Sequence, residues 1–557
     1  MRARILTVQE SRFLEREANR QGLSFSQMME NAGMATAMAI WERAQLRSRH
    51  VVVLVGPGNN GGDGLVAAHY LRACGAEVTV YLWSRQLGGD PNYDRITQDH
   101  IPVVRAEDDM GYQALQALLN SSPVVVDALL GVGASRPIEG SLCEILGLVR
   151  AASSGPTDAV LSGATPRARA AQPVIVAVDC PTGLDCDTGA LDPASFQADL
   201  TVTFIGPKHG MLRFPGAEAV GELVVADIGI SDDLLGYSGW QMATAGLLRS
   251  WLPGRPRSAN KGTFGRALIV AGSIDYPGAA VLAGTAATRV GTGLVTMALP
   301  EPIHTAVVAH LAEATYMLLP QKHGAVSSDA VSAAKAKAAG YDALLVGPGL
   351  TQGSETVAFV HGLLGVGGPG RLPTRGSGDA LRSVLSLETS TLPPLVVDAD
   401  ALNALAAADR WWSGLPTGTI LTPHPGEMAR LIGGGVQAGD VQSAREEVCW
   451  RMVNEWGAVV VLKGAFTLVA EPGGRQVVIP FANAGLASAG SGDVLAGTIT
   501  GLRAQGMGPF EAAVAGAYVH ALAGELVRSD LGDMGMVAAD VALRLPQALR
   551  QIRGQRN

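Results

Sequence analysis

The sequence predicts two α/β domains in tandem, each built on a mainly parallel sheet. At 557 residues the chain is too long for one core, since a domain usually has about 100–200 residues. Short β-branched runs alternate with helical patterns in both halves. Glycine is abundant, with 70 residues, and 47% of the chain is hydrophobic. This composition is typical of an α/β enzyme with many tight turns and large buried cores.

The charge balance and the apolar pattern exclude several functional classes. Lys and Arg number 42 against 50 Asp and Glu, so no positive excess is available to displace phosphate counterions from a nucleic acid. No apolar segment has the length of a signal peptide or a membrane span. The five cysteines are scattered and lack zinc spacing. We therefore expect a cytoplasmic protein that binds small molecules and no membrane.

The first half begins with two helices and continues with parallel strands. Thr7 with Glu10, and Ser24 with Gln27, have the spacing of capping boxes that open two helices. Residues 151–172 are small, polar and aperiodic, which predicts a surface insertion. Near-continuous apolar runs predict strands that are covered on both faces, at Val51–Val55, Val78–Trp83, Val124–Val126 and Val174–Val178.

The second half repeats the alternation with different motifs. Residues 231–260 contain PGRPRSAN and are predicted to be a linker, and residues 366–380 are predicted to be another loop insertion. We therefore divide the chain into domains at 1–230 and 261–557. Six further strands are predicted, at Ala267–Ala271, Gly293–Ala298, Ala343–Val346, Leu395–Val397, Thr419–Leu421 and Val459–Leu462.

A glycine-rich loop, GPGNNGGDG at residues 56–64, follows the first strand. Its glycines satisfy the GxGxxG dinucleotide fingerprint, but the second strand lacks the acidic residue that would bind a ribose hydroxyl. Asn59, Asn60 and Asp63 add side-chain oxygens to the loop. Such oxygens suit a cation and a polar ligand together, which a plain glycine turn would not need.

Two aspartates follow neighbouring strands of the first half. Asp127 comes directly after Val124–Val126, and Asp179 directly after Val174–Val178. Both should lie at the carboxyl ends of parallel strands, where open α/β sheets bind ligands. A single strand-end aspartate is often only a helix cap. Two of them beside the asparagine-containing loop favour a ligand site.

The strongest motif of the second half is Gly490-Ser491-Gly492-Asp493, followed by a helical pattern. A glycine loop that opens a helix presents free amides and the positive end of the helix dipole to phosphate oxygens. Asp493 at that position can accept a proton from a hydroxyl that attacks a phosphoryl group. A second GSGD, at 376–379, has no strand before it and is predicted to carry no function.

Four polar residues of the second half each have two interpretations. His424 lies between prolines and is either a structural loop residue or a ligand contact. Lys463 ends an apolar strand, where it either extends to solvent or binds a ligand. Asp398 and Asp400 are either helix caps or contacts for magnesium and phosphate.

The segments GPGNNGGDG, VDALLGVGASRP, VDCPTGLDCDTG and TFIGPKHGMLRFPG resemble, in order and spacing, the epimerase domain of the NAD(P)H-hydrate repair enzymes over about residues 1–230. The resemblance implies a Rossmann-like three-layer domain that interconverts the R and S hydrates, with K⁺ bound by Asn60, Asp127 and Thr182. It implies that Asp179 is catalytic, and that the hydrate is bound by Asp179 together with Asn59, Asn60, Gly61, Gly62, Asp63, Gly131, Val132, Gly133, Ala134, Ser135, Arg136 and Pro137.

Two positions depart from that family's pattern. Cys180 and Thr182 stand where the family usually has Ile and Ser. Thr182 keeps the hydroxyl, and Cys180 is interpreted as a small buried residue. Epimerisation requires protons to move on and off the ring system, and a carboxyl group in a partly desolvated crevice can do this.

The segments KGTFGRALIVAGS, YPGAA, GPGL, VVDADALN, LTPHPGE, VVLKGAFTLV and NAGLASAGSGDVLAG resemble the ADP- or ATP-dependent NAD(P)H-hydrate dehydratases over about residues 240–557. The resemblance implies a ribokinase-like α/β/α domain, and the fusion favours ADP, bound with Mg²⁺, as the nucleotide. It implies that Asp493 is catalytic and contacts the hydrate with Ala280, Gly349 and His424, and that the nucleotide is bound by Lys463, Gly464, Ala465, Phe466, Thr467 and Gly492.

Together the two resemblances imply a bifunctional enzyme that epimerises hydrated NADH and NADPH and dehydrates the S form with ADP, giving AMP and phosphate. The alternative is a ribokinase-like kinase for a small alcohol, joined to a non-catalytic Rossmann-like scaffold domain. Retention of Asn60, Asp127 and Asp179 argues against a scaffold. We expect a homo-oligomer.

Overall fold

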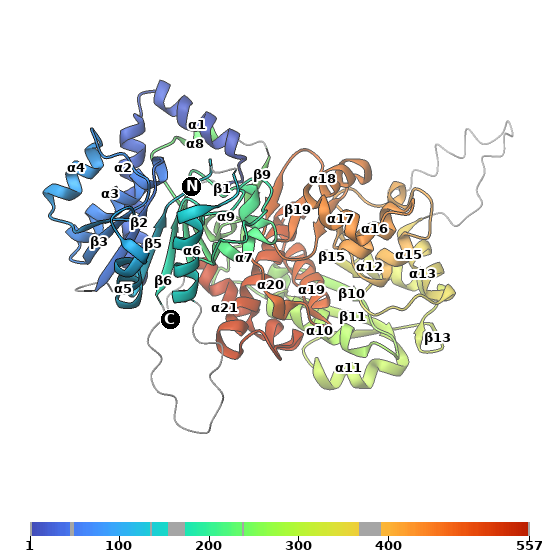
Figure 1. Ribbon diagram of the computed structural model, residues 1–557. Coiled ribbons are helices and arrows are strands. Elements are labelled where there is room, and N and C mark those ends of the chain that lie inside the picture. Colours follow the sequence, from blue (N-terminus) through green and yellow to red (C-terminus); the bar gives the residue numbers. More distant parts are fainter. Residues whose placement is uncertain are drawn as a thin grey trace, which may run out of the picture. The chain divides into compact units, whose positions relative to one another are not determined.

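The chain divides into two compact units, Met1–Tyr237 and Ser238–Asn557. The computed structural model (Figure 1) describes residues 3–44, 49–133, 136–153, 173–236, 239–366 and 392–554. The predicted insertions at 151–172 and 366–380 fall almost wholly outside these residues, and so does the second GSGD. Within the described ranges, no helix is long and apolar enough to cross a membrane.

The first unit contains a seven-stranded sheet in the order β4-β3-β2-β5-β6-β7-β8, in which every neighbouring pair is parallel. The four predicted strands are present. The remaining ones were not predicted, because β7 alternates threonine with apolar residues and both β4 and β8 are partly exposed edge strands. The strands of this sheet are β2 (His50–Val55), β3 (Glu77–Leu82), β4 (Val103–Arg105), β5 (Val124–Ala128), β6 (Val174–Val178), β7 (Leu200–Phe204) and β8 (Glu222–Ala226), and the short strand β1 (Ala3–Arg4) is not part of it.

Helices cover both faces of this sheet, which makes a three-layer domain. Val51, Val53 and Val55 point to a core shared with α1, α2, α3 and α4. Val52 and Leu54 point to the opposite core, under α5 and α6. The alternation explains why the strands are apolar at every position. The helices are α1 (Val8–Arg20), α2 (Phe25–Ala44), α3 (Asn59–Ala73), α4 (Pro91–Gln98), α5 (Gln113–Ser121), α6 (Gly140–Ser153), α7 (Gly216–Val220) and α8 (Asp232–Leu235).

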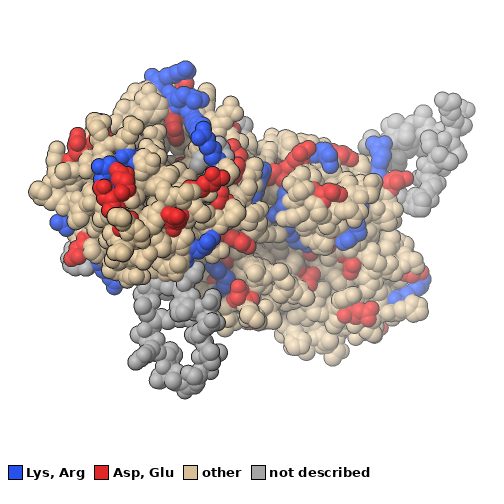
Figure 2. Space-filling view, in the orientation of Figure 1, with Lys and Arg blue, Asp and Glu red and all other residues tan. Residues whose placement is uncertain are grey.

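The predicted helix starts are found at the expected residues. Thr7 Oγ1 accepts a hydrogen bond from the Glu10 amide at 3.1 Å, and Glu10 Oε2 accepts one from the Thr7 amide at 2.8 Å. Ser24 Oγ accepts from the Gln27 amide at 3.1 Å. On the face shown in Figure 2, acidic and basic side chains are interspersed, apart from a basic run along α1, whose arginines are Arg12, Arg16 and Arg20.

The sheet of the second unit runs in the order β9-β20-β19-β18-β17-β16-β15-β10-β11-β12. The pairs from β18 to β12 are parallel, and β19 is antiparallel to both neighbours. The six predicted strands lie within two residues of the observed ones. The strands are β9 (Trp240–Met242), β10 (Arg266–Val270), β11 (Leu294–Pro300), β12 (Thr315–Leu319), β15 (Ala343–Val346), β16 (Leu395–Val397), β17 (Ile420–Leu421), β18 (Val459–Leu462), β19 (Leu468–Ala470) and β20 (Gln476–Val478), with a small hairpin of β13 (Gln321–Lys322) and β14 (Ala325–Val326).

The segment predicted as a linker, 231–260, contains regular structure. It holds α8 and β9, and β9 pairs in parallel with β20. Helix α9 (Ala245–Trp251) follows, and its Leu248 is buried in the core of the second unit. A strand of three residues between polar segments gives no periodic signal, which is why the sequence did not predict it.

Helices also cover both faces of the second sheet (Figure 1). Helices α10, α19, α20 and α21 share one large core with the inner faces of the strands. A Cβ on Gly497 of α19 would lie 2.1 Å from the Ala283 carbonyl of α10, so only glycine permits this close helix contact. The helices are α10 (Pro277–Arg289), α11 (His304–His310), α12 (Val331–Ala338), α13 (Ser354–Leu364), α15 (Asp400–Leu405), α16 (Pro425–Ile432), α17 (Ala438–Ser443), α18 (Arg445–Trp456), α19 (Ser491–Ala504), α20 (Pro509–Leu531) and α21 (Ala538–Arg553).

Two candidate active sites

The first unit has a cavity of about 380 Å³ at the carboxyl ends of its central strands, where α1 and α3 also contribute side chains. Its position agrees with the general rule for ligands of open α/β sheets. Seven of the residues predicted for hydrate binding line it, namely Asn59, Asn60, Asp63, Gly131, Val132, Gly133 and Asp179. The other lining residues are Arg12, Glu15, Pro57, Gly58, Leu129, Leu130 and Phe204.

The polar run that the sequence predicted as a loop is instead the first turn of α3. Gly58 is the N-cap, and the helix begins at Asn59. The glycines allow close packing behind the turn: a Cβ on Gly61 would lie 2.1 Å from the Gly56 carbonyl, and one on Gly62 would lie 2.7 Å from the Met29 side chain. The helix start therefore adds amide donors to the cavity's edge.

Four residues of the predicted binding loop are not among the lining residues of this cavity. Ala134 and Ser135 lie outside the described residues. Arg136 and Pro137 are exposed and do not line the cavity. Their assignment to hydrate binding stays a prediction.

Oxygen atoms gather beside the cavity, at the ends of β5 and β6. Asn60 Nδ2 donates to the Leu130 carbonyl at 3.0 Å, and its buried Oδ1 has no hydrogen-bond partner among the described residues. Thr182 donates to Asp127 through Oγ1 at 2.7 Å and through its amide at 2.8 Å. Burial raises the pKa of Asp127 to about 6. The structure thus brings the three predicted potassium ligands into one hydrogen-bonded group.

Asp179 lies at the end of β6 with a left-handed backbone, at φ +61°. Thr203 Oγ1 and Lys208 Nζ both donate to Asp179 Oδ1, at 3.0 Å and 2.6 Å. Neither partner was predicted as a site residue. Lys208 lies within the TFIGPKHG segment, so its position in a family-like motif was the available signal.

The cavity holds two further carboxyl groups that the sequence did not indicate as titrating groups. Burial, and secondarily the charge of Asp179, raises the pKa of Glu15 and raises that of Asp63 well above its usual range. Glu15 lies on α1 and nothing in the sequence distinguished it from a solvated helix residue. One cavity therefore combines carboxyl groups in different environments.

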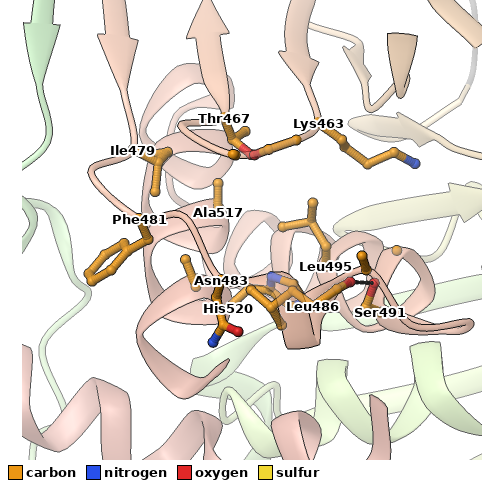
Figure 3. A pocket seen from close by; sticks show the side chains of 15 residues that line it. Lys463, Thr467, Ile479, Phe481, Asn483, Leu486, Ser491, Leu495, Ala517 and His520 are labelled. Atoms are coloured by element: carbon orange, nitrogen blue, oxygen red, sulfur yellow. Dashed lines mark hydrogen bonds between the residues drawn. The ribbon is translucent and has the colours of Figure 1, made fainter. Parts of the chain in front are cut away.

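The second unit has a cavity of about 190 Å³ between β18 and the start of α19 (Figure 3). In Figure 3, Lys463 and Ser491 lie on one side of the cavity and Phe481 on the other. Five of the predicted nucleotide-binding residues line it, namely Lys463, Gly464, Ala465, Thr467 and Gly492. The sixth, Phe466, is not among the lining residues. Apolar side chains complete the wall, among them Ile479, Phe481, Leu486, Leu495 and Ala517.

The start of α19 carries the GSGD motif. Gly490 adopts φ +87°, a left-handed conformation that turns the chain into the helix. The amides of the first turn have no intrahelical carbonyl to bond, so they can bind an anion. Burial, and secondarily the charge of Asp398, raises the pKa of Asp493 to about 7. Asp493 is therefore poised to exchange a proton near neutral pH.

Lys463 is the cation of a buried cluster beside that helix start. Its Nζ donates to Asp398 Oδ1 at 2.8 Å and lies 3.4 Å from Glu427 Oε2. A Cβ on Gly492 would lie 3.6 Å from this Nζ, which places the ammonium beside the α19 amides. The interpretation of Lys463 as a side chain that extends to solvent is therefore wrong, because two buried carboxylates hold it.

Asp398 and Asp400 do not cap helix α15. Asp398 Oδ1 accepts from Thr422 Oγ1 at 2.7 Å as well as from Lys463, and its Oδ2 is buried without a partner among the described residues. Asp400 Oδ2 accepts from the Thr351 amide at 2.8 Å. The residue before α15, Ala399, makes no side-chain cap. The cap interpretation is wrong for both aspartates.

The remaining predicted contacts surround the same edge of the sheet. His424 Nδ1 accepts from the amides of Gly426 at 3.0 Å and Glu427 at 3.3 Å, so it caps α16. Gly349 adopts φ +66°, and a Cβ added to it would lie 2.8 Å from the side chain of Ala279. Ala279 directly precedes Ala280, which is buried on α10. Hydrate contact by His424, Gly349 and Ala280 stays a prediction.

Comparison with known proteins gives family matches in both units. The family described as NAD(P)H-hydrate dehydratase matches residues 267–547, and the family described as YjeF-related protein N-terminus matches residues 26–210. A crystal structure of ADP/ATP-dependent NAD(P)H-hydrate dehydratase from Bacillus subtilis is 30% identical, with a TM-score of 0.44, and covers 56% of this chain and 98% of its own. The expected Rossmann-like and ribokinase-like fold classes are confirmed by these families and by the two sheets.

Curated relatives match both units at once. The bifunctional NAD(P)H-hydrate repair enzyme Nnr of Moorella thermoacetica is 37% identical over 534 residues, covering 94% of this chain and 92% of the relative. The Escherichia coli protein of the same name is 32% identical over 530 residues, covering 95% and 90%. Because such identity extends along nearly the whole chain, this protein belongs to the family of bifunctional NAD(P)H-hydrate repair enzymes.

Proposed function

We propose that the chain restores hydrated NADH and NADPH in two steps. The first unit interconverts the R and S hydrates, and the second unit dehydrates the S form with ADP, giving AMP and phosphate. The observation that carries this proposal is the pairing, in one chain of this family, of an oxygen-lined cavity around Asp179 with an anion-binding helix start that carries Asp493. We further propose that the enzyme acts in the cytoplasm as a homo-oligomer.

In the first unit, Asp179 is the proposed catalytic group. The two epimers differ at the hydrated ring carbon, so interconversion needs a group that takes up and returns a proton beside the ring. Asp179 lines the cavity with its carboxylate partly exposed. The amides of the α3 start, with Asn59 and Asp63, are proposed to bind the hydrate.

Potassium fits the oxygen group next to this cavity. The buried, unpartnered Oδ1 of Asn60 and the carboxylate of Asp127 are hard ligands, and sulfur and imidazole are absent from the group formed with Thr182. We propose that Asn60, Asp127 and Thr182 hold K⁺. When bound, the cation supplies positive charge beside the substrate.

In the second unit, the hydroxyl oxygen of the S hydrate attacks the β-phosphorus of ADP. The new oxygen–phosphorus bond forms as the bond to AMP breaks, and Asp493 accepts the hydroxyl proton. Phosphate then leaves with the carbon–oxygen electron pair. A proton is lost from the neighbouring ring carbon, and the ring double bond is restored. Lys463 and the first amides of α19 bind the transferred phosphate.

Magnesium fits this site through the nucleotide. Asp398 offers a buried, unpartnered Oδ2 beside Lys463, but the described part of the chain holds no group of three His, Cys, Asp or Glu side chains that could bind a metal. Mg²⁺ is commonly held by substrate phosphates, water and one or two carboxylates. When bound, it neutralises phosphate charge, and Asp398 is the carboxylate proposed to contact it.

The test is an incubation of the protein with a mixture of both hydrate epimers and either ADP or ATP. Recovery of reduced-nicotinamide absorbance with release of AMP and phosphate supports the proposal. A ribokinase-like kinase would instead accumulate a phosphorylated product without recovery of the absorbance. Recovery limited to the S fraction would show that the first unit is a scaffold. ADP and ATP are compared at equal concentration to identify the nucleotide.

A further inference from the structure

Lys208 is a buried lysine whose hydrogen bonds are all made inside the first unit. Its side chain is only 1% exposed. Its Nζ donates to Asp179 Oδ1 at 2.6 Å, to Thr203 Oγ1 at 2.7 Å and to the Phe204 carbonyl at 3.2 Å. An ammonium group has three protons, and these three bonds use them. Lys208 therefore has no proton left for a ligand in this arrangement.

Thr203 links the lysine to the same carboxylate. Its hydroxyl accepts from Lys208 and donates to Asp179 Oδ1 at 3.0 Å. Both donors thus meet one oxygen of Asp179, which leaves Oδ2 as the oxygen that can face a ligand. Asp179 lines the cavity, and its left-handed backbone directs the side chain from the end of β6. Such strained conformations concentrate at functional sites.

Of the carboxyl groups around the cavity, Lys208 contacts that of Asp179. The groups that face it from neighbouring elements include one cation and two carboxyl groups whose pKa burial raises. Lys208 Nζ donates a charge-assisted hydrogen bond to Asp179, and among the described residues it donates none to the other two carboxyl groups. The cation is Lys208 after β7, and the carboxyl groups are Glu15 on α1 and Asp63 on α3; the buried thiols Cys180 and Cys186 also lie nearby.

We propose that Lys208, together with Thr203, is a positioning residue for epimerisation: the pair holds Oδ1 of Asp179 in place, with Oδ2 turned to the hydrate. This inference rests on the proposed epimerase function of the first unit. Lys208 and Thr203 fix Asp179 at the wall of the cavity, and the carboxyl groups of Asp63 and Glu15 line the same cavity as candidate partners for proton transfer.

Thr203→Val and Lys208→Met test the inference in the full-length protein. Without ADP the second unit cannot react, so purified R hydrate and chromatographic separation of the epimers measure epimerisation alone. The kcat and KM of each variant are measured at neutral pH and compared with those of the parent protein. Thr201→Val is the matched control, because Thr201 lies on the same strand and its buried hydroxyl donates to the Val220 carbonyl at 2.7 Å, away from Asp179.

A positioning role predicts a fall in kcat with little change in KM. Lys208→Met should lower kcat by about 100-fold at neutral pH, as for loss of a catalytic base, and Thr203→Val by about tenfold. Thr203→Ser keeps the hydroxyl and should restore kcat, and Thr201→Val should leave kcat unchanged.

Other outcomes overturn the inference or identify a different failure. Equal behaviour of Thr203→Val and Thr201→Val would overturn it, whether or not Lys208→Met folds. A rise in KM with an unchanged kcat would also overturn it, since that would indicate a binding role. Absence of epimerisation in the parent protein would contradict the proposed function itself, and dehydration of the S hydrate by the same preparation would show that the chain is folded.

Discussion

Lys463 Nζ lies 2.8 Å from Asp398 Oδ1, and the Asp398 side chain is only 1% exposed. The two residues come from the ends of β18 and β16, 65 positions apart in the sequence. Glu427 approaches the same ammonium at 3.4 Å. One buried cation thus holds two buried carboxylates at the edge of the second unit's cavity, so the contact that supports folding also fixes the ammonium that we propose binds phosphate.

Lys463→Met should destabilise the second unit strongly. Removing one partner of a buried ion pair leaves an uncompensated charge, which typically costs about 3–5 kcal/mol. The measurement is the denaturant midpoint of the second unit, followed by hydrogen exchange of its core strands. Dehydration should fall as well, since Lys463 lies beside the α19 amides.

The matched control is Lys322→Met. Lys322 Nζ lies 2.6 Å from Glu355 Oε1, but this pair is on the surface. Exposed pairs contribute about 0–1 kcal/mol, so the midpoint should hardly move. Equal destabilisation by the two variants would show that burial of the Lys463 cluster does not matter.

Asp493→Asn should separate the two activities. Asparagine cannot accept the hydroxyl proton, so ADP-dependent recovery of reduced nicotinamide should fall by about 10²–10⁴-fold while epimerisation continues. Asp179→Asn should do the reverse: the S fraction is repaired quickly and the R fraction remains. The time course of reduced-nicotinamide absorbance measures both. A single fast phase in Asp179→Asn, or near-parent dehydration in Asp493→Asn, would contradict the corresponding role.

The pH dependence of dehydration should follow the same residue. The pKa of Asp493 is about 7, raised first by burial, and the base must be ionised to act. The rate should therefore fall as the pH decreases below about 7. The measurement is the kcat of dehydration of the S hydrate as a function of pH, from about 7 downward. An unchanged rate down to pH values near the ordinary range of aspartate, about 4, would exclude Asp493 as the base.

Asp493→Asn should also stabilise the second unit at high pH. The folded pKa of about 7 exceeds the unfolded value of about 3.9, so the folded state binds more protons between them and loses stability as the pH rises. Asparagine removes this loss. The gain should be absent near pH 4 and reach up to about 4 kcal/mol above pH 7. Thermal melts of parent and variant at both pH values measure it, and a gain that is equal at both would contradict the linkage.

Potassium should stabilise the first unit, and more so at alkaline pH. Burial raises the pKa of Asp127 to about 6, so protons compete with the cation below that value. Titration with KCl against NaCl should raise the melting temperature more at about pH 8 than at about pH 5. Asp127→Asn should abolish the difference.

The control for this titration is Asp192→Asn. Asp192 accepts backbone hydrogen bonds from Ile138 at 3.0 Å and from Ala194 at 2.8 Å, outside the oxygen group. This variant should keep the response to potassium. Tight binding of zinc or iron by the first unit would contradict a hard-cation site.

Strand positions were predictable because burial on both faces leaves a continuous apolar run. Ala343–Val346, Leu395–Val397 and Val459–Leu462 match the observed strands residue for residue. Strand β12, Thr315–Leu319, was not predicted, since it is a partly exposed edge strand without that pattern. The start of α3 at Asn59 was also missed, because asparagine and glycine normally indicate a loop.

The sequence predicted the candidate catalytic residues, but it did not predict which side chains contact them. The position of Asp179 at the end of a strand could be predicted, because it directly follows an apolar run of strand length. The cation that contacts it, Lys208, lies 29 residues further on, and only the parallel order of β6 and β7 brings the two together. Periodicity reports which positions are buried, and it does not report which buried charges are neighbours.

Among the described residues, the lining of the first cavity comes from Arg12 to Phe204, within the first unit, and the lining of the second from Lys463 to Ala521, within the second unit. The side chains proposed for each reaction therefore come from a single unit. The covalent link then fixes the ratio of the two units at one to one, because both are translated as one chain. A gene split between the units would lose that fixed ratio and keep both sets of catalytic side chains intact, which makes fusion and fission of the two genes an evolutionarily easy exchange.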